Sequence, residues 1–204
     1  MRYEKGHKDE TRRRILAAAS KRFRKKGIAA VGLAGLMADA GLTHGGFYSH
    51  FATKEELVRE ALAFTLDASR AGLARDAAER GGLEAIIRTY LAPAHRDRPD
   101  RGCAIAALAA EVARHPASTR ATLAQHIEAL IGLIAAQLPE VDPTARRRTA
   151  TAVFAAMMGA LQLARVTLDP ARANEILESG VAAALALARV SAAYVFETEI
   201  PAIS

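Results

Sequence analysis

The chain has 204 residues, of which 51% are hydrophobic and only 5% aromatic, and it carries a net charge of +6 with a single cysteine. One cysteine excludes an internal disulfide framework and a cysteine-rich zinc site. The basic start is not followed by an apolar stretch, so no signal peptide is expected. The most apolar segments, near 152–168 and 181–196, contain Gln162, Arg165 and Arg189 and are typical of buried helices rather than membrane spans. We expect a cytoplasmic protein without membrane contact.

The positive charge is concentrated at the N-terminus. Residues 1–56 contain 12 Lys and Arg against 6 Asp and Glu, whereas residues 57–204 contain 16 of each. A basic head on a neutral body favours a chain in which only the head meets a polyanion. The alternative is a solvated surface helix with incidental charge.

The first predicted helix runs from Asp9 to Lys26. A basic arm at residues 1–8 precedes it, and Gly27 suits the end of the helix. A short helix is predicted at 33–39, followed by a tight turn at Gly41.

A second short helix is predicted from Thr43, as its N-cap, to Phe51. Thr53 and Glu56 then have the spacing of a capping box, which opens a long helix ending near 81–82.

The remaining chain divides at proline, glycine and charged segments. Asp142 and Asp169 each precede a proline, and this pair is typical of an N-cap followed by proline at the first helical position. No alternating strand pattern occurs. The sequence therefore predicts an all-α fold of about nine helices, with a head at 9–56 and a body at 57–204. The body helices are expected at about 83–95, 103–114, 116–138, 143–167 and 170–195.

The segment 31–51 has the pattern helix, tight turn, helix. Its apolar residues are expected to share a small core with the first helix, and its polar residues to face outward. Two adjacent glycines cost a helix about 1 kcal/mol each relative to alanine, but they permit close approach to another surface, such as the DNA major groove. The alternative is a loose connection in an ordinary helical domain. The expected core residues are Ile15, Leu16, Phe23, Leu36, Ala40, Leu42, Phe47 and Phe51.

The residues of the head resemble the TetR/AcrR family of regulators. The resemblance covers about residues 9–60, and the variant Gly-Leu-Thr-His-Gly-Gly-Phe-Tyr at 41–48 is similar to one branch of the family. That branch often carries a body-helix start like the one at 101–111 here. Gly32 and Gly46 depart from the usual Ser or Thr, which puts any inherited base specificity in doubt. The matching runs are Thr11-Arg12-Arg13-Arg14-Ile15-Leu16, Ala40-Gly41-Leu42-Thr43, Phe47-Tyr48-Ser49-His50-Phe51, Thr53-Lys54-Glu55-Glu56-Leu57 and Arg101-Gly102-Cys103-Ala104-Ile105-Ala106-Ala107-Leu108-Ala109-Ala110-Glu111.

The resemblance implies a dimeric repressor of a palindromic double-stranded DNA operator. Three positions match typical phosphate contacts, three match the groove-facing end of the recognition helix, and His50 matches a contact to backbone or base. The basic residues of the first helix either add charge contacts or are solvated. The positions that match phosphate contacts are Thr43, Tyr48 and Lys54, and those that match the groove-facing end are His44, Gly45 and Gly46. The basic residues of the first helix and the arm before it, whose role is left open, are Lys5, Lys8, Arg12 and Arg13.

The last two predicted helices, 143–167 and 170–195, are apolar or small around most of their circumference and so must be covered on all sides. The resemblance implies that they form the homodimer, and the alternative is a fully internal hairpin. It also implies a small-molecule effector site in the body; the alternative for each candidate residue is ordinary core. These candidates are Tyr90, His95, Phe154, Met157, Met158 and Gln162.

Cys103 is predicted at a helix N-terminus with Arg98 and Arg101 nearby. Both features favour the thiolate and raise reactivity, and the resembling branch includes regulators thought to sense electrophiles or oxidants. The alternative is a small buried hydrophobic residue.

No cofactor, metal site or enzymatic activity is predicted. The sequence has no nucleophile-elbow, P-loop, dinucleotide or zinc-protease motif, and its six His are scattered. A helical adaptor for protein partners is the other alternative, but an adaptor does not require every lysine to lie at or before Lys54.

Overall fold

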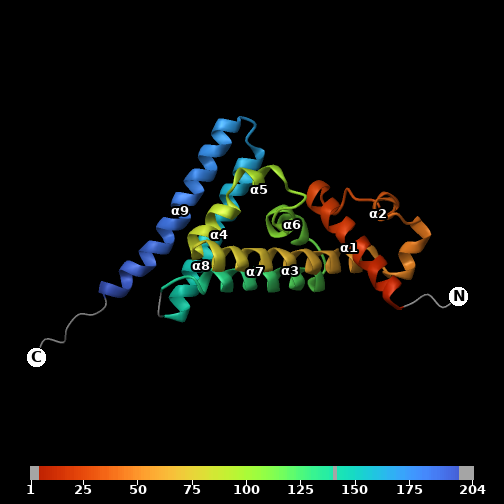
Figure 1. Cartoon of the computed structure of the whole chain (residues 1–204), viewed down its shortest axis with the longest axis horizontal. Coiled ribbons are helices and arrows are strands. Elements are labelled where there is room, and N and C mark those ends of the chain that lie inside the picture. Colours follow the sequence, from red (N-terminus) through yellow and green to blue (C-terminus); the bar gives the residue numbers. More distant parts are fainter. Residues whose placement is uncertain (1–4, 140–141, 198–204) are drawn as a thin grey trace, which may run out of the picture. The chain divides into compact units, whose positions relative to one another are not determined.

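The computed structural model describes residues 5–139 and 142–197, and within them all regular secondary structure is helical (Figure 1). Nine α-helices and one 3-10 helix occur in the described chain, which confirms the predicted all-α class. The elements are α1 (Lys5–Lys26), α2 (Leu33–Asp39), η1 (His44–Ser49), α3 (Lys54–Arg80), α4 (Gly82–Tyr90), α5 (Pro93–Asp97), α6 (Ala104–Val112), α7 (Ala117–Ala135), α8 (Pro143–Val166) and α9 (Pro170–Glu197).

The chain forms two compact units that interleave along the sequence. The head unit contains residues 1–69 and 98–126, and the body unit contains residues 70–97 and 127–204. Helices α3 and α7 each contribute residues to both units. Helix α6 belongs to the head unit, where it packs against α1.

Helix α1 begins four residues before its predicted start. Residues 5–8, expected to lie in a mobile arm, are helical, whereas residues 1–4 lie outside the described part of the chain. The prediction placed the start by the apolar period, but residues 6–10 are all exposed and give no buried face to create one. The C-terminal end is as predicted, because Gly27 has φ 82° and its N–H donates to the carbonyl of Phe23 at 2.8 Å.

The second short helix of the head differs from its prediction. Helix α2 has the predicted bounds and Gly32 at its N-cap, but the segment after the turn is a six-residue 3-10 helix, η1. Thr43 stands at its N-cap and makes no side-chain capping bond, so that prediction was wrong. Short 3-10 pieces suit a segment whose two glycines disfavour a regular α-helix.

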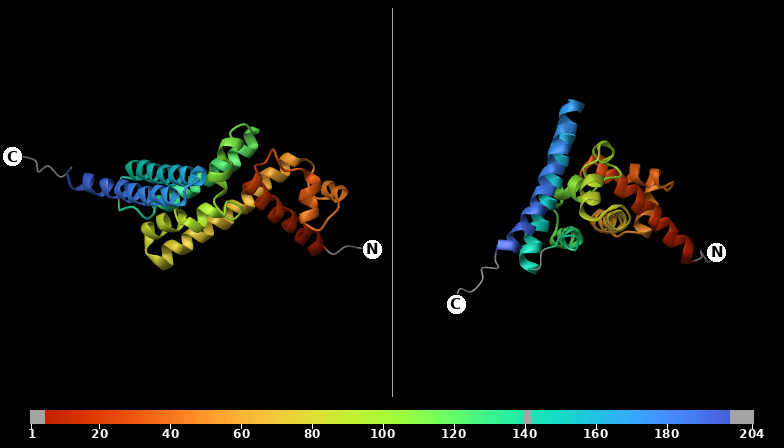
Figure 2. Two further views of the ribbon diagram at one scale, coloured as in Figure 1. Left: turned by 90° about the horizontal axis from the view of Figure 1, so that it is seen from above. Right: turned by 60° about the vertical axis from the view of Figure 1, so that its left-hand side comes forward.

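Helices α8 and α9 form the main hairpin of the body unit and lie side by side in the views of Figures 1 and 2. Both predicted N-caps are confirmed. The Asp142 carboxylate accepts the amides of Thr144 and Ala145 at 3.1 and 2.9 Å, and Asp169 accepts the amide of Ala171 at 2.9 Å. The helix expected at about 83–95 is divided in two: α4 ends at Tyr90 and Pro93 begins the short α5, because proline interrupts a helix.

The α8–α9 crossing depends on the absence of a side chain at Gly180. A Cβ at this position would lie 2.4 Å from the Cβ of Ala160 and 3.2 Å from Cδ1 of Leu91. At this point of the crossing, the observed separation of the α8 and α9 backbones therefore requires a glycine.

We expect Gly180→Ala to lower the free energy of unfolding by about 1–3 kcal/mol, because the helices must separate to accommodate the methyl group. Chemical denaturation followed by circular dichroism measures this loss. Gly132→Ala is the matched control: Gly132 lies in the last turn of α7, where a Cβ meets nothing within 4 Å, so this variant should be equally or slightly more stable. Equal stability of the two variants would show that the crossing tolerates a methyl group.

Candidate nucleic-acid interface and effector region

The 3-10 helix η1 is anchored by two buried phenylalanines. Phe47 and Phe51 are fully buried, and their rings stack with centroids 5.7 Å apart. Leu36 from α2 and Ile15 from α1 are buried as well, which confirms the predicted shared core. Of the residues expected in that core, Leu42 alone is half-exposed, whereas Leu16, Phe23 and Ala40 are buried.

The polar side of η1 faces solvent, as the sequence predicted. Thr43, His44 and Gly45 are exposed, and 64% of the Tyr48 side chain is accessible. The His44 and Tyr48 rings lie edge to face, 6.4 Å apart. Two other candidate DNA contacts, Gly46 and His50, are half-buried. Burial and the positive charges of Lys8 and Arg12 lower the pKa of His50, which favours its neutral form.

The turn before η1 is fixed by glycine and arginine together. Gly41 adopts φ 71°, and a Cβ there would lie 2.8 Å from Nη2 of Arg14. That guanidinium donates to the carbonyl of Ala40 at the end of α2. The turn therefore requires a residue that tolerates positive φ and leaves room for the arginine.

Most arginines of α1 bond groups within the head unit. Arg12 donates to the carbonyl of His50, bonds Glu60 at 2.5 Å and places its guanidinium 4.2 Å from the centroid of the Phe51 ring. Through these contacts Arg12 holds the end of η1 against α3. Arg22 pairs with Asp39 of α2, one of its hydrogen bonds being 2.8 Å long.

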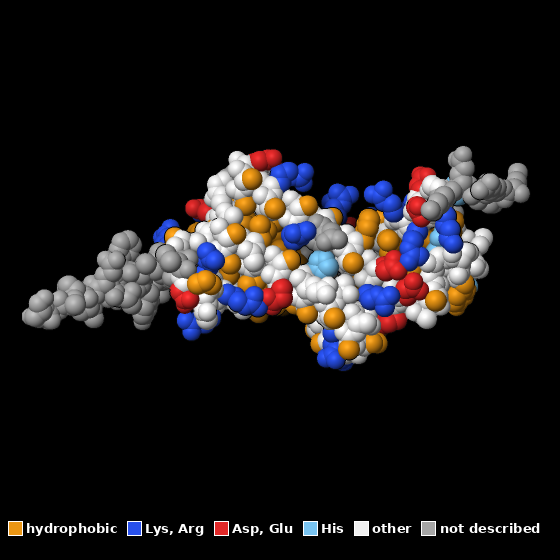
Figure 3. Space-filling view, turned by 90° about the horizontal axis from the view of Figure 1, so that it is seen from below, with side chains coloured by type: hydrophobic (Ala, Val, Ile, Leu, Met, Phe, Trp, Pro, Cys, Tyr) orange, Lys and Arg blue, Asp and Glu red, His pale blue; other side chains and the backbone are white. Residues whose placement is uncertain are grey.

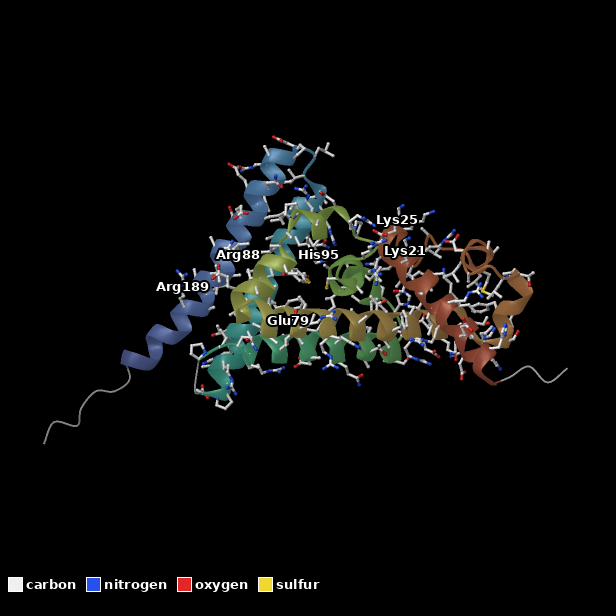
Figure 4. The ribbon with its side chains drawn as sticks, in the orientation of Figure 1. Lys21, Lys25, Glu79, Arg88, His95 and Arg189 are labelled. Atoms are coloured by element: carbon white, nitrogen blue, oxygen red, sulfur yellow. The ribbon has the colours of Figure 1, made fainter. Side chains whose placement is uncertain are left out.

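The remaining cations on α1 are mainly lysines. Lys21 and Lys25 are exposed, lie four residues apart on one helix face and line a shallow groove together with Lys26 (Figure 4). On the face of the molecule in Figure 3, Lys and Arg side chains are interspersed with Asp and Glu.

The start of α3 has the predicted capping box with one difference. Thr53 Oγ1 accepts the amide of Glu56 at 3.1 Å, and the Glu56 carboxylate accepts the amide of Ala52, not that of Thr53, at 2.7 Å. Lys54, a predicted phosphate contact, is half-buried, and its Nζ donates to the carbonyl of Ile28 at 3.0 Å.

The sequence analysis missed three polar contacts within the head unit. Each joins α6, or the chain just before or after it, to another part of that unit. Arg24 donates to the carbonyl of Asp100 at 2.9 Å. Glu111 accepts the amides of Ile28 and Ala29 at 2.8 and 2.6 Å. The third contact, made by Glu55, joins the first turn of α3 to the chain after α6. No local motif marks these pairs, since their members lie 60–83 residues apart.

The Glu55 carboxylate accepts Thr119 Oγ1 at 2.5 Å and lies 3.0 Å from His115 Nδ1. Burial alone would raise the pKa of Glu55. The hydrogen bonds from Thr119 and His115 outweigh burial and lower the pKa, so the carboxylate remains ionised.

Cys103 is the N-cap of α6 and its side chain is 7% exposed. The structure adds Arg24 to its surroundings, a residue that sequence proximity did not indicate. Burial lowers the pKa of the Arg24 guanidinium, and the charges of Asp100 and Cys103 act in the opposite direction. Cys103 belongs to the head unit, whereas the other effector candidates belong to the body unit.

Three effector candidates of the body unit are in contact. The Tyr90 ring lies edge to face with the rings of His95 and Phe154, at centroid distances of 4.8 and 6.2 Å. His95 Nδ1 lies 2.5 Å from the carbonyl oxygen of Tyr90, and Arg165 donates to the carbonyl of His95 at 3.2 Å. Met157 is buried on α8, Met158 is half-buried, and Gln162 is exposed. Among the described residues, no group of three or more His, Cys, Asp and Glu is placed to hold a metal ion.

Comparison with known proteins identifies the architecture. The family model described as bacterial regulatory proteins, tetR family, matches residues 15–61, and the model of the tetracyclin repressor-like C-terminal domain matches residues 72–179. The chain belongs to the TetR family. This agrees with the resemblance inferred from the head sequence and extends it through most of the body.

Individual relatives are similar to this TetR-family chain in sequence or in fold. The probable HTH-type transcriptional regulator ArpR of Pseudomonas putida is 37% identical over 86 residues, which span 42% of this chain and 40% of ArpR. A TetR transcriptional regulator from Chloroflexus aurantiacus is 28% identical with a TM-score of 0.68, covering 90% of this chain and 94% of its own. The reduced form of Escherichia coli NemR has a TM-score of 0.72 at 22% identity, covering 86% and 95%, and indicates shared fold alone.

An apolar stripe is exposed on α8 and α9 of this TetR-family chain. On α8 it contains Ala155, Gly159, Leu163 and Val166, and the last two side chains are 60% and 77% exposed. On α9 it contains Ala182, Ala183, Ala186 and Leu187. By length and composition α8 alone among the described helices could cross a membrane, and only a third of its apolar window is buried.

We expect the body unit to lose stability as the pH falls below about 6.5, because burial lowers the pKa of His95 below its usual value. The unfolded chain then binds a proton that the native chain does not bind. The stabilising effect of neutral His95 is therefore complete above the unfolded pKa and declines below it. Thermal melting of wild type at pH 7.5 and 5.5 should show a larger decrease in Tm than that of His95→Gln. Substitution of the exposed His44 by Gln is the control and should leave the decrease unchanged, whereas equal decreases in wild type and His95→Gln would contradict this assignment.

Proposed function

We propose that this TetR-family regulator represses transcription by binding a palindromic DNA operator as a homodimer. The observation that carries this proposal is η1, a glycine-containing helix with a solvent-facing polar side and a fully buried aromatic base. In a helix-turn-helix domain the second helix enters the major groove with its N-terminal residues toward the bases. Residues 9–56 are the proposed DNA-binding domain, and residues 57–204 carry effector binding and dimerisation.

The proposed DNA contacts divide into two classes. His44, Gly45 and Gly46 form the N-terminal part of η1 and would approach base edges, because the glycines let the backbone come close to the groove. Thr43, Tyr48 and Lys54 would bond phosphates and fix the register of the protein on the duplex. His50 would approach the DNA backbone through its exposed part.

Operator binding is tested by selecting DNA from a random duplex pool at about 0.15 M salt. We expect a palindrome to be enriched, and Tyr48→Phe to weaken binding to it by about tenfold per half-site through loss of a hydrogen bond to a charged oxygen. Thr122→Val, a substitution on α7 outside the proposed interface, is the control and should bind like wild type. If only salt-sensitive binding without sequence enrichment appears, the protein is not a sequence-specific regulator.

The proposed dimer forms through α8 and α9, because the exposed stripe of small and apolar residues on these helices requires a cover that the described chain does not supply. Two copies would form a four-helix interface. The small side chains at Ala155, Gly159 and Ala183 would let the helices of the two copies pack closely.

We expect Leu163→Glu to convert the dimer to monomers at micromolar concentration, because it would place two uncompensated carboxylates in the interface. Sedimentation velocity measures the change. Ala124→Glu adds the same charge to an exposed position of α7 and should remain dimeric. A Leu163→Glu variant that sediments as wild type would exclude the stripe as the interface.

The proposed effector site is in the body unit, around the ring cluster of Tyr90, His95 and Phe154, with Met157, Met158 and Gln162 on the adjoining helix α8. A small molecule that binds one body conformation more tightly than another would shift the population between DNA-binding and released states. An electrophilic effector would instead react at Cys103. Its low exposure means that the start of α6 must open before the thiol is alkylated.

A further inference from the structure

The peptide group between Ile28 and Ala29 bonds a cation at one end and an anion at the other. Its carbonyl accepts Lys54 Nζ at 3.0 Å, and its N–H donates to Oε1 of Glu111 at 2.6 Å. The second carboxylate oxygen, Oε2, accepts the amide of Ile28 at 2.8 Å. Lys54 at the start of α3 and Glu111 on α6 are thereby connected through one backbone amide.

The two charges strengthen each other's hydrogen bonds. A cation at the carbonyl and an anion at the N–H polarise the amide in the same direction, and charge-assisted bonds are the strong class. Ile28 and Val31 are 2% and 1% exposed, so the turn that carries this amide is seated on the core of the head unit. The bridge therefore has a fixed support.

Glu111 lies at an unfavourable place for a carboxylate unless hydrogen bonds compensate its charge. A carboxylate near the C-terminal end of α1 faces the negative end of the helix dipole. In a Schellman turn the amide after the left-handed glycine would bond back to α1. Here the amide of Ile28 donates to Glu111 across the tertiary fold, and the two amide bonds offset the unfavourable dipole.

We infer that Glu111 is a positioning residue for operator binding, acting through the Ile28–Ala29 peptide on Lys54. An ammonium has three N–H donors. One is held by Ile28, which leaves two for a phosphate at a fixed place beside η1. Ordering this flexible side chain before DNA arrives removes part of the entropy cost of the contact. This inference rests on the proposed function, because it assigns a residue of α6 to the phosphate contact of that function.

The test is a double-mutant cycle on the full-length dimer with the selected operator, measured across a range of salt concentrations. We expect Lys54→Met to weaken binding and to lower the salt slope by about two, because one phosphate contact is lost in each half-site. Glu111→Gln should weaken binding by about tenfold per half-site and lower the slope in the same direction. The double variant should bind no more weakly than Lys54→Met, because Glu111 acts through Lys54.

The direction of the change in DNA affinity on removal of a carboxylate distinguishes a positioning role from a long-range electrostatic effect. Removing a negative charge favours DNA binding, so Glu128→Gln, which has the same charge change on α7, should bind as tightly as wild type or more tightly. Additive losses in the double variant, or an unchanged salt slope for Glu111→Gln, would overturn the inference. If Glu111→Gln melts early, Glu111→Asp keeps the charge but shortens the reach and should show the same non-additivity. Failure of wild type to select an operator would instead remove the proposed function, and the inference with it.

Discussion

The geometry of the head depends on how a short, glycine-containing 3-10 helix is held from outside. Six residues with two adjacent glycines cannot stabilise a defined helix through their own backbone bonds. Phe47 and Phe51 supply the anchorage by burial, and Arg12 bonds the carbonyl of His50 at the helix end. The exposed side chains of η1 are thus not needed to hold the helix in place, so they are available to contact a partner.

The basic residues of the head unit also divide into those that hold the structure and those that stay exposed. Arginine has a planar fork of donors that suits several simultaneous contacts, whereas lysine is a compact and strongly hydrated charge. In the head unit Arg12, Arg14, Arg22 and Arg24 bond carbonyls or carboxylates of other elements, and Lys21, Lys25 and Lys26 line an open groove. These arginines therefore help to fix the shape of the head unit, while these lysines keep their charge at its surface.

Much of the fold could be predicted because its signals are local. Gly27, the Thr53 capping box and the Asp142 and Asp169 caps each act within a few residues, so the sequence indicated them correctly. The early start of α1 and the 3-10 form of η1 were missed. An exposed helical turn leaves no apolar period, and the choice between α and 3-10 depends on small differences within one turn.

The tertiary contacts of the site lie beyond sequence reasoning for a different reason. Lys54 was predicted as a phosphate contact by its position in a motif, and the motif contains no information about Ile28 or Glu111. Glu111 was visible only as the last residue of a matching run in α6. Its bond to a turn 82 and 83 residues away becomes evident when the fold brings α6 against α1.

The polar bridges and the apolar stripe impose different requirements on the molecule. Contacts through Glu111, Glu55 and Arg24 are directional, so α6 and its flanks must stay within hydrogen-bond distance of the rest of the head unit to keep them. Apolar burial on α8 and α9 is not directional and tolerates small sliding movements. A dimer that forms through this stripe, as proposed above, would therefore tolerate small movements of the body helices. The contacts of α6 and its flanks within the head unit tolerate no comparable displacement, because each needs its donor and acceptor within hydrogen-bond distance.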